Sequence, residues 1–256
     1  LEFGDYEVSL TVPSDHIVAA TGTLQNAGEV LSEVQRERLR RAEGSDEPSF
    51  IVTPEEARKN EENKEEGSKT WVFRAENVRD FAWASSRKFI WDAAHVQVGE
   101  KKERVWAMSF FPNEGEPLWS RYSTHSVIHG LQVFSKHTFD YPYPVAISVH
   151  GPVFGMEYPM ICFNGPRPEK DGTYSRRTKY ALISVVIHEV GHNYFPMIVN
   201  SDERQWTWMD EGLTTFCQFL AEREWEEKYP SGRGMPPSIA SYMKRGDEMP
   251  IMTNSE

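Results

Sequence analysis

The sequence contains two histidines, His188 and His192, that stand four residues apart, with Glu189 directly after the first. On an α-helix, positions four apart lie on one face, so the two imidazoles can hold one metal ion between them. Glu189 is turned about 100° around the helix, where its carboxylate can reach a water molecule on that ion. Glu211 follows His192 after eighteen intervening residues. This spacing predicts a metal site made of His188, His192 and Glu211, with Glu189 as the general base.

The donor set indicates which metal the site holds. Two imidazoles and one carboxylate suit zinc, and three protein ligands leave a fourth position open for water, as in catalytic zinc sites. Residues 180–187, before the motif, are almost wholly apolar, so the helix is predicted to be buried. We therefore expect one zinc ion per chain. The alternative is that both histidines are core residues with protein hydrogen-bond partners.

Charge and composition exclude several classes of partner. The chain of 256 residues is 39% hydrophobic and 12% aromatic, which is enough to build hydrophobic cores. Its net charge of −11 argues against binding to nucleic acids or anionic membranes, because both require basic patches. No apolar run approaches the roughly 20 residues of a membrane span. Cys162 and Cys217 are expected to be buried free thiols.

Residues 1–105 are predicted to form the C-terminal part of an antiparallel β domain. Alternating apolar positions mark strands near the N-terminus and again at residues 69–74. Between them, residues 28–68 form a charged insertion, which is typical of a solvated connection. Inside it, Thr53 is followed by Pro at the next position and by Glu56, a capping-box pattern that predicts a short exposed helix. We expect the domain boundary at the end of this part, near residue 105.

Residues 106–256 are predicted to form a second domain that mixes helices with extended segments. Asp210 is expected to cap the helix that carries Glu211. His125 and His129 are also four residues apart, but no Glu belongs to their motif, so we interpret them as packing or surface residues. The expected elements are a helix at 117–140, a strand at 145–149, an extended stretch at 153–163, the motif helix from about 175 to Pro196, and a helix from 211 to about 228.

These motifs resemble those of the gluzincin aminopeptidases, the family of alanyl and leucyl aminopeptidases and leukotriene hydrolase. The two histidines, the gap of eighteen residues and Glu211 match the family's zinc signature. The segment from Trp208 to Gly212 has the sequence Trp-Met-Asp-Glu-Gly and is similar to the family's Trp-Leu-Asn-Glu-Gly. Upstream of the zinc helix, Met156 and Glu157 match the family's Gly-Ala-Met-Glu-Asn strand, with Gly155 in place of the family's Ala.

The resemblance implies an α+β protein in which a thermolysin-like zinc-peptidase domain follows part of an antiparallel β domain. It implies a zinc aminopeptidase that removes the N-terminal residue of a peptide, with Glu189 as the general base. Glu157 would hold the α-amine of the substrate, and Gly155 and Met156 would contact the substrate backbone. Two other classes remain open: a zinc endopeptidase in which Glu157 binds no amine, and a non-catalytic binding protein that keeps zinc for stability.

The resemblance also implies that the chain is a fragment, truncated at the C-terminal end of its catalytic domain. The family stabilises the oxyanion with zinc and with a Tyr hydroxyl that lies well downstream of the third ligand, whereas 45 residues follow Glu211 here. Tyr229 and Tyr242 are the tyrosines in that span, and neither stands at the family's distance. We therefore expect zinc binding with weak activity.

Overall fold

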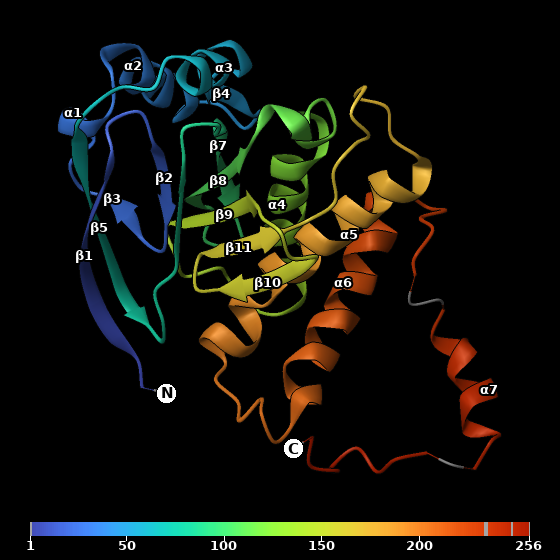
Figure 1. Cartoon of the computed structure of the whole chain (residues 1–256). Coiled ribbons are helices and arrows are strands. Elements are labelled where there is room, and N and C mark those ends of the chain that lie inside the picture. Colours follow the sequence, from blue (N-terminus) through green and yellow to red (C-terminus); the bar gives the residue numbers. More distant parts are fainter. Residues whose placement is uncertain (1, 233–234, 247, 256) are drawn as a thin grey trace.

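The computed structural model describes residues 2–232, 235–246 and 248–255. A mixed sheet of six strands lies between a group of helices and a smaller set of strands (Figure 1). The α+β class predicted from the sequence is therefore confirmed. Cys162 and Cys217 are buried free thiols, as predicted. In the described part of the chain, no helix has the length and apolar character needed to span a bilayer.

The six-stranded sheet joins strands from the two parts of the chain that the sequence suggested. In spatial order its strands are β10 (Gly155–Tyr158), β11 (Ile161–Asn164), β9 (Val145–His150), β8 (Glu103–Phe111), β7 (Ile90–Val98) and β4 (Ser49–Val52). The pairs β11–β9 and β9–β8 are parallel, and the other pairs are antiparallel. Residue 105, near which we expected a domain boundary, falls inside β8. Backbone hydrogen bonds along β8 therefore hold segments from both sides of that position in one sheet.

Helices cover one face of this sheet. They are α4 (Leu118–His137), α5 (Arg176–Gly191) and α6 (Glu211–Trp225). α4 packs on β7, β8 and β9, and α5 packs on β9, β10 and β11. Alternation along β8 sends Ser109 towards the helices, where its hydroxyl lies 2.8 Å from that of Ser123 on α4. Trp106, Met108 and Phe110 consequently face the opposite side of the sheet.

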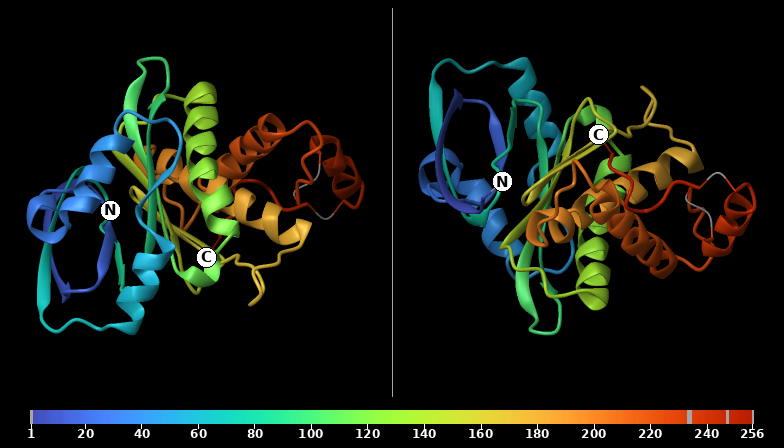
Figure 2. Two further views of the ribbon diagram at one scale, coloured as in Figure 1. Left: turned by 90° about the horizontal axis from the view of Figure 1, so that it is seen from above. Right: turned by 90° about the horizontal axis from the view of Figure 1, so that it is seen from below.

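A smaller set of strands packs on that opposite side, so that sheet, strands and helices form layers (Figure 2). Antiparallel pairing in the order β1-β5-β3 makes a three-stranded sheet, and β2 pairs with β6. Buried apolar side chains from both strand sets and from the helices form one continuous core. The strands are β1 (Gly4–Pro13), β2 (Ile17–Ala20), β3 (Thr23–Leu24), β5 (Ser68–Val78) and β6 (Trp83–Ser86).

The charged insertion contains regular structure. Its helices are α1 (Ala27–Val30), α2 (Glu33–Ala42) and α3 (Pro54–Glu62), which lie at the top of Figure 1. Ser32 with Gln35 and Thr53 with Glu56 form capping boxes at the starts of α2 and α3, so the helix predicted at Thr53 is confirmed. β4 lies between these helices, pairs with β7 and buries its last two residues. The insertion is therefore tied into the large sheet.

Several helices end at other positions than those predicted. The helix expected at 117–140 spans Leu118–His137, and the helix that begins at Glu211 ends at Trp225 rather than near 228. The motif helix stops at Gly191, and a π-helical segment, Asn193–Ile198, carries the chain through Pro196. The remaining described elements are the 3-10 turns Asn113–Gly115, Thr207–Met209 and Pro236–Ser238 and the helix α7 (Ile239–Met243).

Candidate metal centre

The two histidines of the motif lie at the C-terminal end of α5, where the helix is buried. Ser175 caps the other end of α5, because its side chain accepts a hydrogen bond from the backbone N–H of Thr178 at 3.0 Å. His188 is 8% exposed and His192 is 1% exposed, since β9, β10, β11, α4 and α6 surround this end of the helix. Buried imidazoles require polar partners, which the neighbouring elements supply.

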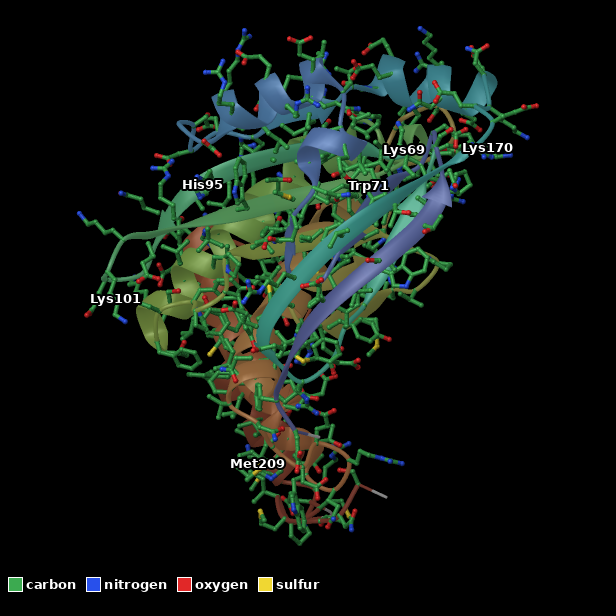
Figure 3. All side chains as sticks on the ribbon, turned by 90° about the vertical axis from the view of Figure 1, so that its left-hand side faces the viewer. Lys69, Trp71, His95, Lys101, Lys170 and Met209 are labelled. Carbon is green, nitrogen blue, oxygen red and sulfur yellow. The ribbon has the colours of Figure 1, made fainter. Side chains whose placement is uncertain are left out.

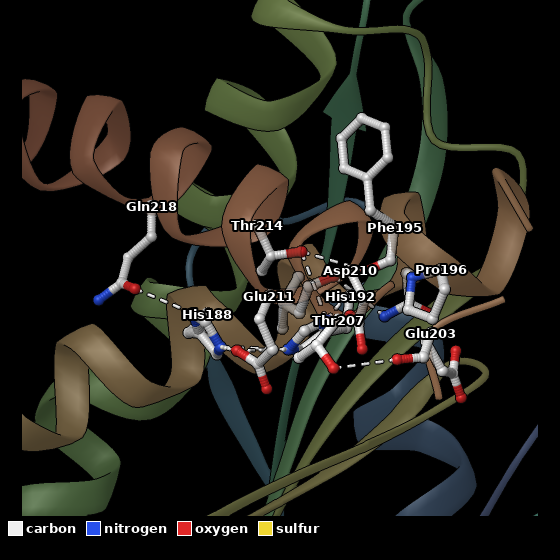
Figure 4. A network of polar contacts seen from close by, with 12 residues as sticks. His188, His192, Phe195, Pro196, Glu203, Thr207, Asp210, Glu211, Thr214 and Gln218 are labelled. Carbon is white, nitrogen blue, oxygen red and sulfur yellow. Dashed lines mark hydrogen bonds and ion pairs between the residues drawn. The ribbon is translucent and has the colours of Figure 1, made fainter. Parts of the chain in front are cut away.

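His188, His192 and Glu211 form a triangle of donor atoms (Figure 4). The two histidine Nε2 atoms are 3.1 Å apart. Oε2 of Glu211 lies 3.1 Å from Nε2 of His188 and 4.0 Å from Nε2 of His192. Donors bound to a tetrahedral zinc ion at about 2.0–2.1 Å are separated by roughly 3.3 Å. The donor types and their spacing therefore fit a zinc ion.

Hydrogen bonds on the far side of each imidazole leave its Nε2 free to bind a metal. Nδ1 of His188 lies 2.9 Å from Oε1 of Gln218, an oxygen that can only accept. The amide nitrogen of Gln218 donates to Glu222 at 2.8 Å, which fixes the orientation of the amide group. Nδ1 of His192 lies 2.9 Å from the carbonyl oxygen of Phe195. Both Nδ1 atoms therefore donate, so in the neutral form of each imidazole, which is the form that binds a metal, Nε2 carries the lone pair.

The carbonyl group of Phe195 is available because the helix breaks there. Phe195 has φ −136° and ψ 111°, an extended conformation that is favoured before a proline such as Pro196. Its carbonyl oxygen turns to His192 and also accepts a hydrogen bond from the hydroxyl of Thr214 at 3.1 Å. Pro196 was expected only to end the motif helix. In the structure, the break at Phe195 also supplies a partner for one of the two histidines.

Asp210 has a different role from the one that the sequence suggested. We predicted it as the N-cap of α6, but its side chain makes no capping hydrogen bond and its backbone is helical. Oδ1 of Asp210 instead lies 2.6 Å from Nδ1 of His192. Burial disfavours the charged form of His192, but Asp210, Glu157 and Glu189 outweigh it and raise the pKa of His192 to about 9. Asp210 thus occupies the predicted N-cap position, but its side chain contacts His192 and does not cap the helix.

Glu189, the predicted general base, is buried against a glycine. Burial, reinforced by the carboxylates of Glu157 and Glu211, raises the pKa of Glu189 to about 8 against the opposing effect of His192. Its Oε2 has no hydrogen-bond partner among the described residues. A Cβ atom at Gly155 would lie 2.2 Å from Oε1 of Glu189. Only glycine permits this close approach, so Gly155 sets the position of the Glu189 carboxylate.

Glu157 faces the same centre from β10. Its carboxylate lies within 4.8 Å of donor atoms of Glu189 and His192. Burial raises its pKa, although His192 acts in the opposite direction. Alternation along the strand puts Gly155 and Glu157 on the face towards α5, whereas Met156 lies on the other face and is 39% exposed. The structure therefore brings the side chain of Glu157 into the centre and leaves that of Met156 outside it.

A hydrogen-bond network behind His188 was not foreseen from the sequence. From Gln218 it passes to Glu222, whose Oε1 accepts from the hydroxyl of Ser184 at 2.7 Å. That hydroxyl lies 2.8 Å from the phenolic oxygen of Tyr229, one of the two downstream tyrosines. Gln218 stands seven residues after Glu211 and shares its face of α6, so helical spacing could have identified it.

His129, which we interpreted as a packing residue, does pack between helices. Its Nε2 lies 2.7 Å from the carbonyl oxygen of Ala221 on α6. Its ring meets that of Trp225 edge-on, with 5.1 Å between the ring centroids. Burial lowers the pKa of His129, despite the contact with Ala221. The packing interpretation is therefore confirmed for this residue.

A cleft of 680 Å³ opens onto the donor triangle. Gly155, His188, Glu189 and Glu211 line its inner end. From there it follows α5 towards the start of the helix, where Arg176 and Arg177 belong to the wall. This volume is within the range of small-molecule and cofactor sites, so a substrate group can reach the donor triangle and Glu189 together.

Comparison with solved structures identifies the architecture around this centre. The chain has the fold of M1 zinc metallopeptidases. Against the M1 zinc metallopeptidase from Deinococcus radiodurans, the TM-score is 0.58 at 17% identity, and the match covers 99% of this chain and 48% of that chain. Against a mutant two-domain M1 zinc metallopeptidase bound to L-arginine, the TM-score is 0.57 at 16% identity, with 97% and 46% of the two chains covered.

A third M1 structure adds a bound peptide. The Deinococcus radiodurans enzyme, as a mutant bound to a Tyr-ser-ala substrate, matches with a TM-score of 0.52 at 15% identity, over 95% of this chain and 45% of that chain. The chain thus spans about half the length of the M1 structures that it matches. No protein-family model matches the chain, and no curated protein matches its sequence.

Proposed function

We propose that the chain contains the catalytic centre of a zinc-dependent aminopeptidase, an enzyme that hydrolyses the N-terminal peptide bond of its substrate. The observation that carries this proposal is the position of Glu189, whose buried carboxylate lies beside the triangle of His188, His192 and Glu211 at the end of an open cleft. A structural zinc site has four protein ligands and no use for an adjacent base. The M1 fold supports the same function.

In the proposed reaction, the metal ligands and Glu189 have different roles. His188, His192 and Glu211 would hold the zinc ion, which would supply a Lewis acid for the peptide carbonyl group and lower the pKa of a bound water molecule. Glu189 takes a proton from the attacking water and delivers it to the leaving amine nitrogen as the C–N bond breaks. Burial raises the pKa of Glu189 above that of an exposed glutamate and so favours proton uptake by its carboxylate.

Glu157 is the residue that would make the enzyme an exopeptidase. In the folded chain, its carboxylate lies near Glu189 but is not part of the donor triangle, so it can pair with a substrate ammonium group. β10 is also the edge strand of the six-stranded sheet, and its open edge can pair with an extended peptide. In the matched M1 structures, the bound molecules are a tripeptide substrate and a free amino acid.

The test uses two aminoacyl substrates that differ only in an acetyl group on the amine. The chain is loaded with zinc and assayed on aminoacyl chromogenic substrates, free and N-acetylated, with and without a chelator. We expect zinc-dependent cleavage of the free-amine substrate and little cleavage of the acetylated one, because acetylation removes the charge that Glu157 recognises. Equal cleavage of both would favour the endopeptidase alternative, and zinc binding without cleavage would favour a non-catalytic protein.

A binding measurement separates amine recognition from turnover. An amino-acid hydroxamate, free and N-acetylated, is titrated into the zinc-loaded chain and into a Glu157→Gln variant. Charge-assisted hydrogen bonds contribute about 1.5–3 kcal/mol, so the free amine should improve affinity by roughly 10- to 150-fold in the parent chain and much less in the variant. The same preference in both chains would remove Glu157 from the proposal.

A further inference from the structure

The cleft at the metal centre continues into a second hollow near the start of α5. The hollow has a volume of 690 Å³, and it shares Phe154, Arg177 and Ala181 with the cleft. Its other walls come mainly from residues 150–153, at the end of β9, and from residues 165–167, after β11. Because the two spaces have wall residues in common, a peptide held at the metal centre can extend into the hollow.

Two backbone hydrogen bonds fix one wall of the hollow. The N–H of Gly165 donates to the carbonyl oxygen of Phe154 at 3.0 Å. The N–H of Gly151 donates to the carbonyl oxygen of Asn164 at 3.0 Å. A Cβ atom at position 165 would lie 2.4 Å from the carbonyl oxygen of Val153, so this close approach requires glycine. The two segments are therefore held together, and this wall of the hollow is preformed.

The proposed catalytic centre sets the direction in which a bound peptide leaves it. With its amine at Glu157, a peptide places its first carbonyl group beside Glu189, whose carboxylate lies against Gly155. The peptide therefore runs from Glu157 towards Gly155, antiparallel to β10 and along the open edge of that strand. Beyond Gly155 it meets Phe154 and Val153, which line the hollow.

Strand and helix geometry give the same reach for such a peptide. Residues of paired strands face one another, so a first residue opposite Glu157 puts the fourth and fifth opposite positions 154 and 153. α5 rises about 1.5 Å per residue, which places Arg177 about 18 Å from Glu189 along the helix axis. An extended peptide covers that distance in about five residues at roughly 3.3 Å each. The fourth and fifth residues of the peptide would therefore lie in the hollow.

Two arginines make the hollow positive in a chain whose net charge is −11. Arg167 and Arg177 both line it and are exposed, and no carboxylate belongs to its described wall. In the described part of the chain neither guanidinium group forms an ion pair, whereas Arg79 and Arg87 each pair with a carboxylate. Burial, and then the charge of Arg167, lower the pKa of His150 in the same wall to about 4. The hollow therefore favours an anionic group.

Neighbouring charged groups have partners of their own. The guanidinium group of Arg176, in the wall of the cleft, lies over the ring of Tyr180 at 5.4 Å from its centroid. The carboxylate of Glu114 pairs with the ammonium group of Lys88. The two arginines of the hollow are therefore the cationic groups that a carboxylate of a bound peptide can approach.

We propose that the hollow selects peptides with a carboxylate at the fourth or fifth residue, supplied by an acidic side chain or by the C-terminus. Arg167 and Arg177 bind this carboxylate through charge-assisted hydrogen bonds, which the planar guanidinium group suits. Glu157 holds the amine at the other end of the peptide. The inference rests on the proposed function, because the amine at Glu157 determines which residues reach the hollow.

The first experiment measures the binding of three pentapeptides by isothermal titration calorimetry. The zinc-loaded Glu189→Gln chain is used so that the peptides are not consumed. One peptide has Asp at its last two positions and a C-terminal amide, the second has Asn there and an amide, and the third is all alanine with a free C-terminal carboxylate. Two exposed ion pairs should make the Asp peptide bind about 3- to 30-fold more tightly than the Asn peptide.

The third peptide identifies the source of the carboxylate. Tighter binding of the free acid than of the Asn amide supports recognition of the C-terminal group, and tighter binding of the Asp amide supports recognition of acidic side chains. Added salt should reduce either preference, because it screens exposed charges. Equal affinity for all three peptides overturns the proposal.

Variants then place the carboxylate in the hollow. Arg167→Gln and Arg177→Gln remove one charge each, and the double variant should abolish the preference for the Asp peptide. Lys101→Gln removes the same charge from the turn between β7 and β8 and should leave the preference unchanged. In Figure 3, Lys101 lies at the opposite edge of the molecule from Lys170, which belongs to the same connection as Arg167. A preference that survives in the double variant overturns the proposal.

Acetylation of the peptide amine separates this inference from the proposed function. Loss of affinity on acetylation reports recognition of the amine by Glu157, whereas the difference between the Asp and Asn peptides reports the two arginines. If acetylation has no effect and the Asp preference still depends on the arginines, the exopeptidase proposal fails and the acidic preference stands. If acetylation weakens binding and the Asp and Asn peptides bind equally, the exopeptidase proposal stands and this inference is overturned.

Discussion

Two buried polar regions lie on the helical side of the six-stranded sheet, and they respond to burial in the same way. Glu189 stands at the metal centre near the end of α5, and Asp92 of β7 lies beneath α4. Burial raises the pKa of Glu189 to about 8 and that of Asp92 to about 7. A raised pKa alone therefore does not distinguish a candidate catalytic carboxyl group from a buried structural one.

The difference lies in what surrounds each carboxyl group. Asp92 is 2% exposed and hydrogen-bonds to the hydroxyl group of Thr124, which begins a chain of hydroxyl groups between the sheet and α4. The chain continues through Ser109, Ser123 and Ser148. Glu189 instead borders a cleft, and its carboxylate lies within 4.8 Å of donor atoms of His192 and Glu157. Convergent ligands and access to a cleft, rather than burial, therefore support the catalytic role that we propose for Glu189.

The sharpest way to test this contrast is to neutralise each carboxyl group in turn. Glu189→Gln should lower kcat on a free-amine aminoacyl substrate by about 10²–10⁴ if proton transfer is its role, while the zinc content stays at the parent level. Asp92→Asn should leave kcat close to that of the parent. Zinc analysis and steady-state kinetics on the three chains measure both effects. Loss of zinc in Glu189→Gln would show that Glu189 is a ligand and not the base.

Asp92→Asn should instead change how stability depends on pH. The folded chain keeps Asp92 protonated up to about pH 7, whereas the unfolded chain ionises it near 3.8, so the parent loses stability as pH rises between these values. The advantage of the Asn variant should grow by about 2–3 kcal/mol between pH 5 and 8. Urea unfolding of both chains at several pH values measures it. A difference that does not vary with pH would contradict a raised pKa for Asp92.

Gly155→Ala tests the close contact beside the metal centre. The added methyl group would overlap Oε1 of Glu189, so the carboxylate must move, and a displacement of about 1 Å can cost up to about 10² in kcat. Gly151→Ala is the matched control, because a Cβ atom there meets Phe163 at an ordinary 3.5 Å. Kinetics and zinc content are measured for both variants. A fully active Gly155→Ala variant would show that the position of Glu189 tolerates this shift.

Gln218→Ala has the smallest expected effect, and it tests the partner of a ligand rather than a ligand. Loss of the hydrogen bond to Nδ1 of His188 should weaken zinc binding by about 10- to 100-fold. Gln132→Ala, at an exposed position on α4, serves as the control. Competition of each chain with a chelating dye for zinc measures the affinity. Equal zinc affinity in both variants would mean that Gln218 does not orient His188.

The interactions within single segments could be predicted from the sequence. The capping box at Thr53, the cap of α5 within residues 171–175, and the two histidines on one helix face all depend on residues three or four positions apart. Such contacts form wherever the local backbone is helical, so their spacing is sufficient to identify them. The separation of Glu211 from His192 was informative for a different reason, because it matches a known zinc signature.

The tertiary structure alone decided which distant segments meet. It turned Asp210 from a predicted helix cap to His192, brought Gly155 against Glu189, and placed β8 at the junction of the two halves of the large sheet. These contacts join residues that are many positions apart, and they depend on how strands pair and layers pack. The spacing of residues within one segment does not specify how that segment packs against others.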